Sequence, residues 1–155
     1  MQPAPVSRDG FDVPPDPTEL AGARRRLSSW LAAVGAAPAP ITDLVVAANE
    51  ALTNAIDHSG TRRPVRVELA SAEGAVRITV RDFGRWSHEM SNPDNGRGLL
   101  LMDALVEQLE VIRSDTGTTV RLVRRLVPRR TPPGSGTVRG ATRAGRGGRA
   151  APGPA

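Results

Sequence analysis

The chain has 155 residues, about one domain, and 39% of them are hydrophobic, enough for a modest core. No apolar run approaches the ~20 residues of a membrane span, so we expect a soluble cytoplasmic protein. It contains no cysteine and no lysine, which excludes disulfides, Cys-based zinc sites, P-loop nucleotide binding and Schiff-base catalysis. The formal net charge of +5 arises in a tail after residue 127 that holds six arginines and no acidic residue, so residues 1–127 carry about −1.

The first third of the chain predicts two helices after a polar lead-in. Residues 1–15 are rich in proline and polar residues, and we expect them to be irregular. Asp16 and Pro17 then suit the cap and the first position of a helix. Apolar residues follow at helical spacing as far as Gly35, a suitable stop, and the same spacing predicts a second helix over about 41–58.

After residue 64 the apolar residues alternate with polar ones, which is typical of strands. Two alternating runs flank Glu73-Gly74 and predict an antiparallel hairpin. The elements predicted in this part are strands at 65–69 and 76–81, a polar loop at 84–98, a helix at about 99–108, and a second strand pair at 109–113 and 118–126.

This order of helices and strands predicts an α+β fold, a two-layer α/β sandwich with helices on one face of a mixed, mostly antiparallel sheet. We place the domain at residues 11–127, after an irregular lead-in at 1–10. The tail at 128–155 is rich in Arg, Gly and Pro, with too few apolar residues to offset its ordering entropy. We therefore expect the tail to be disordered.

Three polar residues of the second predicted helix, Glu50, Asn54 and His58, follow one another at intervals of four. At 100° per residue, each step changes the direction by only about 40°, so the three side chains project from one stripe. Taken alone, such a stripe is best interpreted as a solvated polar face. The alternative is a cation site, because carboxylate and amide oxygens are the ligands that Mg²⁺ prefers.

Asp82 is a stronger candidate because the alternation of Val76, Ile78 and Val80 places it on the buried face. A buried carboxylate is costly unless something pairs with it. Either the strand has ended and Asp82 caps a turn, or Asp82 accepts a hydrogen bond from a ligand amino group; we favour the ligand. Thr118 shares the inward face of its own strand and could bond to the backbone or reach a ligand held against Asp82.

Gly96-Arg97-Gly98 stands just before the third predicted helix. Free amides and the positive end of the helix dipole make such a position an anion site, and Arg97 adds charge. Glycines before helices are also ordinary turn residues.

The order of these segments is more specific than any one of them. ANEALTNAIDH (Ala48–His58), RDFG (Arg81–Gly84), GRGLLLM (Gly96–Met102) and GTTV (Gly117–Val120) together resemble the sequence boxes of the GHKL (Bergerat-fold, histidine-kinase-like) ATPase superfamily. The short lid, the GRGL-x-LM form and the preceding helix are most similar to the anti-sigma-factor serine/threonine kinases (RsbW-like) of bacterial partner-switching systems. In the lid, Trp86 stands where the family often has a second glycine.

The resemblance implies ATP and Mg²⁺ as ligands and a role for each matching residue. Glu50 would be the general base that takes the proton from an attacking serine hydroxyl, and Asn54 would bind Mg²⁺ at the phosphates. Asp82 would accept a hydrogen bond from the adenine amino group, with Thr118 supporting it through water. The remaining nucleotide-binding positions would be Gly84, where the base approaches, Gly96, Arg97 and Gly98, which hold phosphates, and His58, at a position often occupied by His.

The implied function is phosphorylation of a serine of an anti-sigma antagonist, together with sequestration of a sigma factor, by a homodimer. The alternative is a catalytically weak or inactive GHKL domain that acts as a nucleotide-regulated protein-binding module. Nucleic-acid binding through the arginine tail ranks last, because the tail has no aromatic residue for base stacking.

Overall fold

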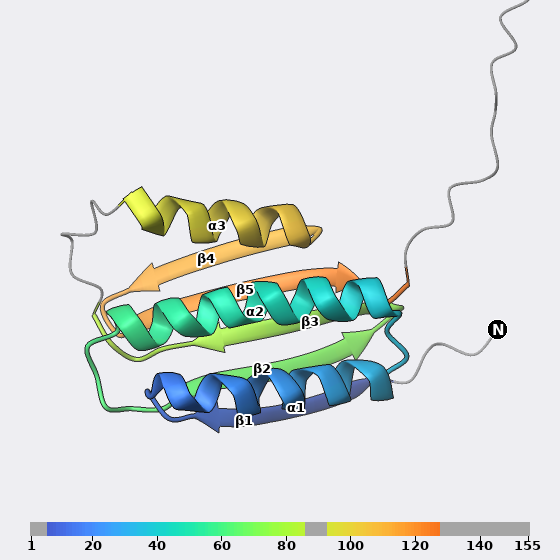
Figure 1. Ribbon diagram of the computed structural model, residues 1–155, viewed down its shortest axis with the longest axis horizontal. Helices are drawn as coiled ribbons and strands as arrows, with labels where there is room; N and C mark the ends of the chain where they lie inside the picture. The colour runs from blue at the N-terminus through green and yellow to red at the C-terminus, as the bar shows by residue number, and fades with distance from the viewer. Residues whose placement is uncertain (1–5, 86–92, 128–155) are drawn as a thin grey trace, which may run out of the picture.

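The computed structural model describes residues 6–85 and 93–127, without the side chains of 93–96. The elements are β1 (Ser7–Val13), a short 3-10 helix (Pro17–Glu19), α1 (Leu20–Ala33), α2 (Pro38–His58), β2 (Val65–Ala72), β3 (Ala75–Arg81), α3 (Pro93–Leu105), β4 (Gln108–Ser114) and β5 (Gly117–Arg125), as Figure 1 shows. Within this part of the chain, no helix has the length and apolar character that crossing a membrane requires.

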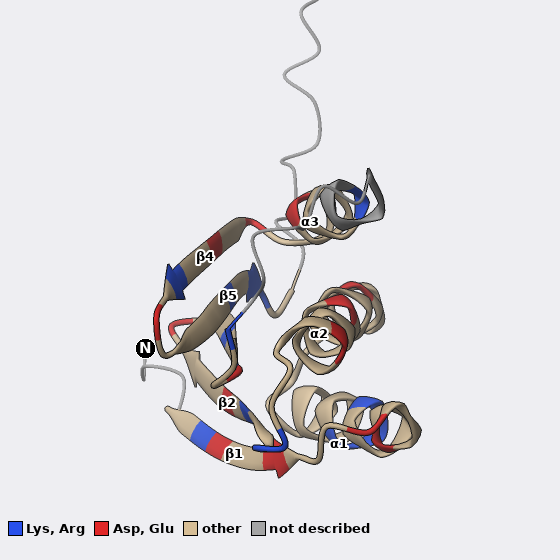
Figure 2. Cartoon of the chain, turned by 90° about the vertical axis from the view of Figure 1, so that its left-hand side faces the viewer, with Lys and Arg blue, Asp and Glu red and all other residues tan. Residues whose placement is uncertain are grey.

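The five described strands form one sheet in the order β1-β2-β3-β5-β4. α1, α2 and α3 all lie on one face of this sheet, with α2 between the other two (Figure 2). This arrangement confirms the predicted two-layer α+β fold. Every neighbouring pair of described strands is antiparallel, so the expectation of a mixed sheet is corrected to an antiparallel one.

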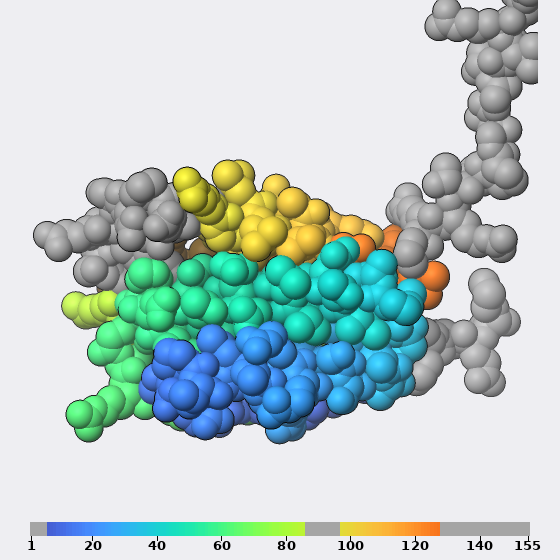
Figure 3. Space-filling model, viewed as in Figure 1, coloured from blue at the N-terminus to red at the C-terminus, as the bar shows by residue number. Residues whose placement is uncertain are grey.

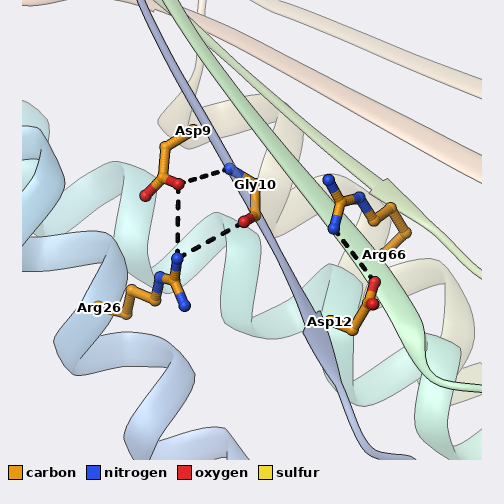
Figure 4. Close-up of polar contacts among 5 residues, drawn as sticks. All are labelled: Asp9, Gly10, Asp12, Arg26 and Arg66. Carbon is orange, nitrogen blue, oxygen red and sulfur yellow. Dashed lines mark hydrogen bonds and ion pairs between the residues drawn. The ribbon is translucent and has the colours of Figure 1, made fainter.

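The N-terminal segment differs from its prediction, because Ser7–Val13 forms the edge strand β1 instead of an irregular lead-in. Only Phe11 and Val13 of this strand are buried apolar residues, a run too short to reveal alternation in the sequence. The strand is stabilised by partners far along the chain. It pairs with β2 along its whole length, and Asp9 bonds to Arg26 of α1 at 3.4 Å (Figure 4).

The predicted start and stop of the first helix are both observed. Asp16 accepts hydrogen bonds at 2.8 Å from the backbone N–H and from the hydroxyl of Thr18. These bonds, the backbone one first, lower the pKa of the Asp16 carboxyl, because they favour its charged form. At the other end Gly35 has a φ of +87°, a conformation that glycine adopts without strain.

The other two helices begin earlier than predicted, and each begins at a proline. α2 starts at Pro38 and α3 at Pro93, ahead of the expected starts at about 41 and 99. A proline suits the first turn of a helix, where the backbone N–H has no intrahelical partner. Pro38 therefore opens a helix ahead of the predicted start, and Pro93, which falls in the predicted polar loop, opens another.

The core lies between the helices and the inner face of the sheet. Four alanines of α2 (Ala47, Ala48, Ala51 and Ala55) are buried at 2% exposure or less, so this central helix lies close to its neighbours. Figure 3 shows α2 packed between α1 and α3 across the helical face. The largest fully buried side chains of the core are Leu27, Leu31, Leu44, Leu52, Leu69, Ile78, Met102 and Leu122.

Candidate nucleotide-binding site

The polar stripe of α2 faces the beginning of α3. Glu50 and Asn54 are partly buried, and a Cβ added at Gly98 would lie 3.4 Å from both Asn54 Nδ2 and Glu50 Oε2. The fold thus brings together two sequence segments that are more than 40 residues apart. His58 ends the same helix one turn beyond Asn54 and is also partly buried. The stripe is therefore not a fully solvated face.

Asp82 and Thr118 meet where β3 ends and β5 begins. Both are buried, at 2% and 3% exposure, which confirms that both residues lie inside. Asp82 Oδ1 accepts from the backbone N–H of Gly84 at 3.2 Å and of Thr118 at 3.3 Å, and the Asp82 N–H donates to the Thr118 carbonyl at 3.0 Å. The turn-capping interpretation of Asp82 is therefore correct, and a role towards a ligand would be additional to it.

Two glycines allow the backbone to approach closely around Asp82. A Cβ at Gly84 would overlap the carbonyl group of Ser59, the residue that follows α2. A Cβ at Gly117, whose φ is +146°, would overlap the carbonyl group of Asp82. The end of β3 is thus packed directly against the end of α2 and the start of β5, and this packing holds the Asp82 carboxylate in place.

Phe83, between Asp82 and Gly84, contacts two arginines. The guanidinium carbons of Arg63 and Arg81 lie 4.3 Å and 5.0 Å from the centre of its ring. Cation–π attraction of this kind contributes about 0.5–1 kcal/mol at exposed sites. These contacts help to position the segment that carries Asp82, and the contact with Arg63 could not be predicted from the sequence, because Arg63 lies in the loop between α2 and β2.

The glycine motif lies within α3 and not ahead of it, which corrects the prediction of two glycines before a helix start. α3 begins at Pro93, so Gly96 lies in its first turn and Arg97 and Gly98 follow. Only the first four N–H groups of a helix lack intrahelical partners. The amide donors for an anion would therefore come from residues 94 and 95, and Gly98 matters because it lies beside Glu50 and Asn54, where a Cβ would be 3.4 Å from both side chains.

Ser59 is a further buried residue near this site, and its position could not be predicted from the sequence. It is 3% exposed, and its Oγ has no hydrogen-bond partner among the described residues. Its place directly after His58 was the only signal in the sequence, and such a residue is ordinarily interpreted as the end of a helix.

A hollow on the helix-free face of the sheet is a rival location for a ligand. Its volume is about 430 Å³, and four arginines line it: Arg8, Arg66, Arg77 and Arg121. Pockets that hold a flat base are lined mostly by apolar and aromatic side chains with a few polar groups. This charged hollow does not have that character, so the site beside α2 is the better candidate.

Comparisons with known proteins identify the family of the chain. The family model of the histidine kinase-like ATPase domain matches residues 13–124. The chain is 26% identical to the anti-sigma F factor of Bacillus cytotoxicus over 120 residues. The aligned region covers 67% of this chain and 82% of that protein.

Two solved structures are similar in fold. The structure of the RsbU and RsbW domains of Rv1364c from Mycobacterium tuberculosis matches with a TM-score of 0.67 and 28% identity, over 79% of this chain. This chain spans only 33% of that protein. The SiaB-SiaC complex from Pseudomonas aeruginosa matches with a TM-score of 0.57 at 15% identity, over 74% of this chain and 88% of that one, and this likeness concerns the fold alone.

The family model spans most of the chain, from the end of β1 to the end of β5. It includes the sequence boxes around Asn54, Asp82, Gly98 and Thr118, which the fold gathers at one end of α2 and of the adjoining strands. The chain therefore belongs to the histidine kinase-like ATPase domain family.

Proposed function

We propose that this domain is an ATP-dependent protein serine/threonine kinase of the anti-sigma-factor type. The observation that carries the proposal is that Gly98 in α3 lies beside both Glu50 and Asn54 in α2, so that a Cβ at this position would be 3.4 Å from each side chain. It brings a candidate general base and a candidate metal ligand to the beginning of a helix, where amide donors favour phosphate groups.

Adenine would bind against the buried end of β3. Asp82 is already fixed by hydrogen bonds from Gly84 and Thr118, so its carboxylate needs no rearrangement to accept from an adenine amino group. Thr118 would support the base through water. Gly84 would lie next to the base, and Arg97 and His58 would complete the nucleotide site.

Mg²⁺ would be held by Asn54 together with the phosphates of ATP. An amide oxygen beside a carboxylate fits this ion, which usually takes one or two protein ligands and the substrate phosphates. The ion would neutralise charge on the phosphates.

Glu50 would accept the proton of an incoming serine hydroxyl, so that the oxygen can attack the terminal phosphate of ATP. The serine would belong to an anti-sigma antagonist, and the domain would also sequester a sigma factor and act as a homodimer. The similarity to the anti-sigma F factor of Bacillus cytotoxicus supports this class of partner. The alternative function is a nucleotide-regulated binding module without turnover.

The test is transfer of labelled γ-phosphate from Mg-ATP to a panel of purified antagonist proteins, by the wild type, Glu50→Gln and Asp57→Asn. Asp57 is an exposed carboxylate of the same helix and serves as the matched control. We expect serine labelling to fall about 10²- to 10⁴-fold in Glu50→Gln, the usual contribution of a general base, and to be unchanged in Asp57→Asn. Wild-type protein that binds ATP yet labels no antagonist would favour the binding module.

A further inference from the structure

Four exposed arginines gather beside the candidate nucleotide site, on two segments that are distant in the sequence. Arg62 and Arg63 belong to the loop between α2 and β2, and Arg81 and Arg85 lie at and just after the end of β3. The ring of Phe83 joins the two segments, because the guanidinium carbons of Arg63 and Arg81 lie 4.3 Å and 5.0 Å from its centre. These four arginines are called the arginine cluster below.

The charge of the arginine cluster is not compensated within the described part of the chain. The ion pairs formed there involve none of the four arginines. The two segments that carry them, residues 59–64 and 81–85, contain one carboxylate, Asp82, which is buried. Arg81 also lies directly opposite Arg66 in the register of β2 and β3, and like charges in that position lower stability. A bound anionic group would relieve this repulsion, so the cluster suits a negatively charged partner.

The surroundings of the cluster favour the carboxylates of a protein over the phosphates of a nucleic acid. A guanidinium group matches the two oxygens of a carboxylate. The ring of Phe83 is partly buried and already in contact with two guanidinium groups, which makes it a poor platform for stacking a nucleobase. Asp12 and Glu68, on the neighbouring outer face of β1 and β2, would repel a chain of phosphates, whereas a protein surface can match mixed charges.

The cluster adjoins the nucleotide site through the segment that carries Asp82. Arg81 directly precedes Asp82, and Gly84 packs against the Ser59 carbonyl, three residues before Arg62. Figure 1 shows the end of β3, the end of α2 and the start of α3 at the same end of the molecule, the end that faces the viewer in Figure 2. A protein that docks on the cluster would therefore lie beside the bound nucleotide.

We propose that the arginine cluster docks an acidic surface of the protein whose serine is phosphorylated. The inference rests on the proposed kinase function and adds to it the residues that select the protein substrate. Exposed charges at an interface set the rate of association and the choice of partner. The cluster therefore acts on the KM for the protein substrate and not on kcat.

The test is a double charge reversal, Arg62→Glu/Arg81→Glu, with Arg8→Glu/Arg77→Glu as the matched control. All four residues are exposed arginines outside the ion pairs of the described chain, and both variants change the net charge equally. Arg77 lies on the same face of β3 as Arg81. Phe83 keeps the nearer of its two guanidinium contacts, so the fold should be preserved, as circular dichroism can verify.

Binding of a fluorescent oligoglutamate peptide is measured first, because it needs no nucleotide. The affinity should be about 10-fold lower for Arg62→Glu/Arg81→Glu and within about 2-fold of the wild type for the control, and added salt should weaken wild-type binding. Equal affinities of all three proteins, or an equal loss in both variants, would overturn the inference. Tighter wild-type binding of a single-stranded oligodeoxythymidine of the same length, lost in the same variant, would also overturn it and assign the cluster to nucleic acid.

Phosphotransfer then tests the link to catalysis. With an antagonist protein that the wild type labels, Arg62→Glu/Arg81→Glu should raise the KM for that protein about 10-fold and leave kcat and Mg-ATP affinity unchanged. An unchanged KM would refute the docking role. If the wild type labels no antagonist, the proposed function fails, and the assignment to a phosphorylated partner fails with it. The peptide measurement still decides in that case whether the arginine cluster binds acidic chains.

Discussion

Gly84 connects the end of β3 to the end of α2, and only a residue without a side chain fits there. A Cβ would overlap the Ser59 carbonyl, which is backbone and cannot move aside as a flexible side chain would. The same glycine donates its N–H to Asp82 Oδ1. A single residue therefore holds two parts of the candidate site together.

We predict that Gly84→Ala lowers the free energy of unfolding by about 1–3 kcal/mol, the range of overpacking at a constrained position. Gly22→Ala is the matched control. Gly22 lies inside α1, where a Cβ would meet only the end of Arg25 at 3.8 Å, and alanine should stabilise that helix by up to about 1 kcal/mol. Urea unfolding of both variants measures the difference; equal stability of Gly84→Ala and wild type would contradict the close packing described above.

The positions of some of these residues could be predicted from the sequence, whereas the contacts of others could not. The inward placement of Asp82 and Thr118 followed from the alternation along their strands, and the structure confirms it. The roles of Gly84 and Ser59 did not follow, because each depends on a contact between the end of a helix and the end of a strand. Periodicity within one element carries no information about such a contact.

At the scale of the elements, α3 is held at both ends by α2 and β5. Near its start, Gly98 lies beside Glu50 and Asn54 of α2. At its end, the Leu105 carbonyl accepts a hydrogen bond from Arg124 of β5, and Arg124 also pairs with Asp43 of α2 at 2.7 Å. The pair is largely shielded from solvent, with side-chain exposures of 22% and 30%.

Breaking this connection should cost more than breaking a surface ion pair. We predict that Arg124→Met lowers the free energy of unfolding by about 1–3 kcal/mol, because Asp43 and the Leu105 carbonyl lose a partner in a shielded place. Arg121→Met, which breaks the exposed pair with Glu110, should cost about 0–1 kcal/mol. Equal losses in urea unfolding would mean that the Arg124 pair does not stabilise the position of α3.

The elements that the sequence predicted well are those with a strong local signal. The β2–β3 hairpin turns at Glu73 and Gly74, which both have positive φ, as a tight two-residue turn requires. The edge strand β1 was missed because it depends on pairing with β2 and on Asp9 bonding to Arg26. The start of α3 was missed because Pro93 was interpreted as part of a loop.

At the scale of the whole molecule, the two faces of the sheet differ in character. The helical face holds the apolar core and the candidate nucleotide site, whereas the opposite face carries the arginine-lined hollow. The predicted tail at 128–155 lies outside the described residues, as does Trp86 of the lid. The central claim concerns the helical face: residues from α2, β3, α3 and β5 form one nucleotide site.

Calorimetric titration of Mg-ATP into the wild type and into Asp82→Asn tests this claim most directly. The asparagine oxygen can still accept from Gly84 and Thr118, so the fold should be preserved, as circular dichroism can verify. The wild type should bind, and the variant should lose at least about 10-fold in affinity, because its neutral amide replaces a charged acceptor. Equal binding by both proteins, or no binding by the wild type, would contradict the account.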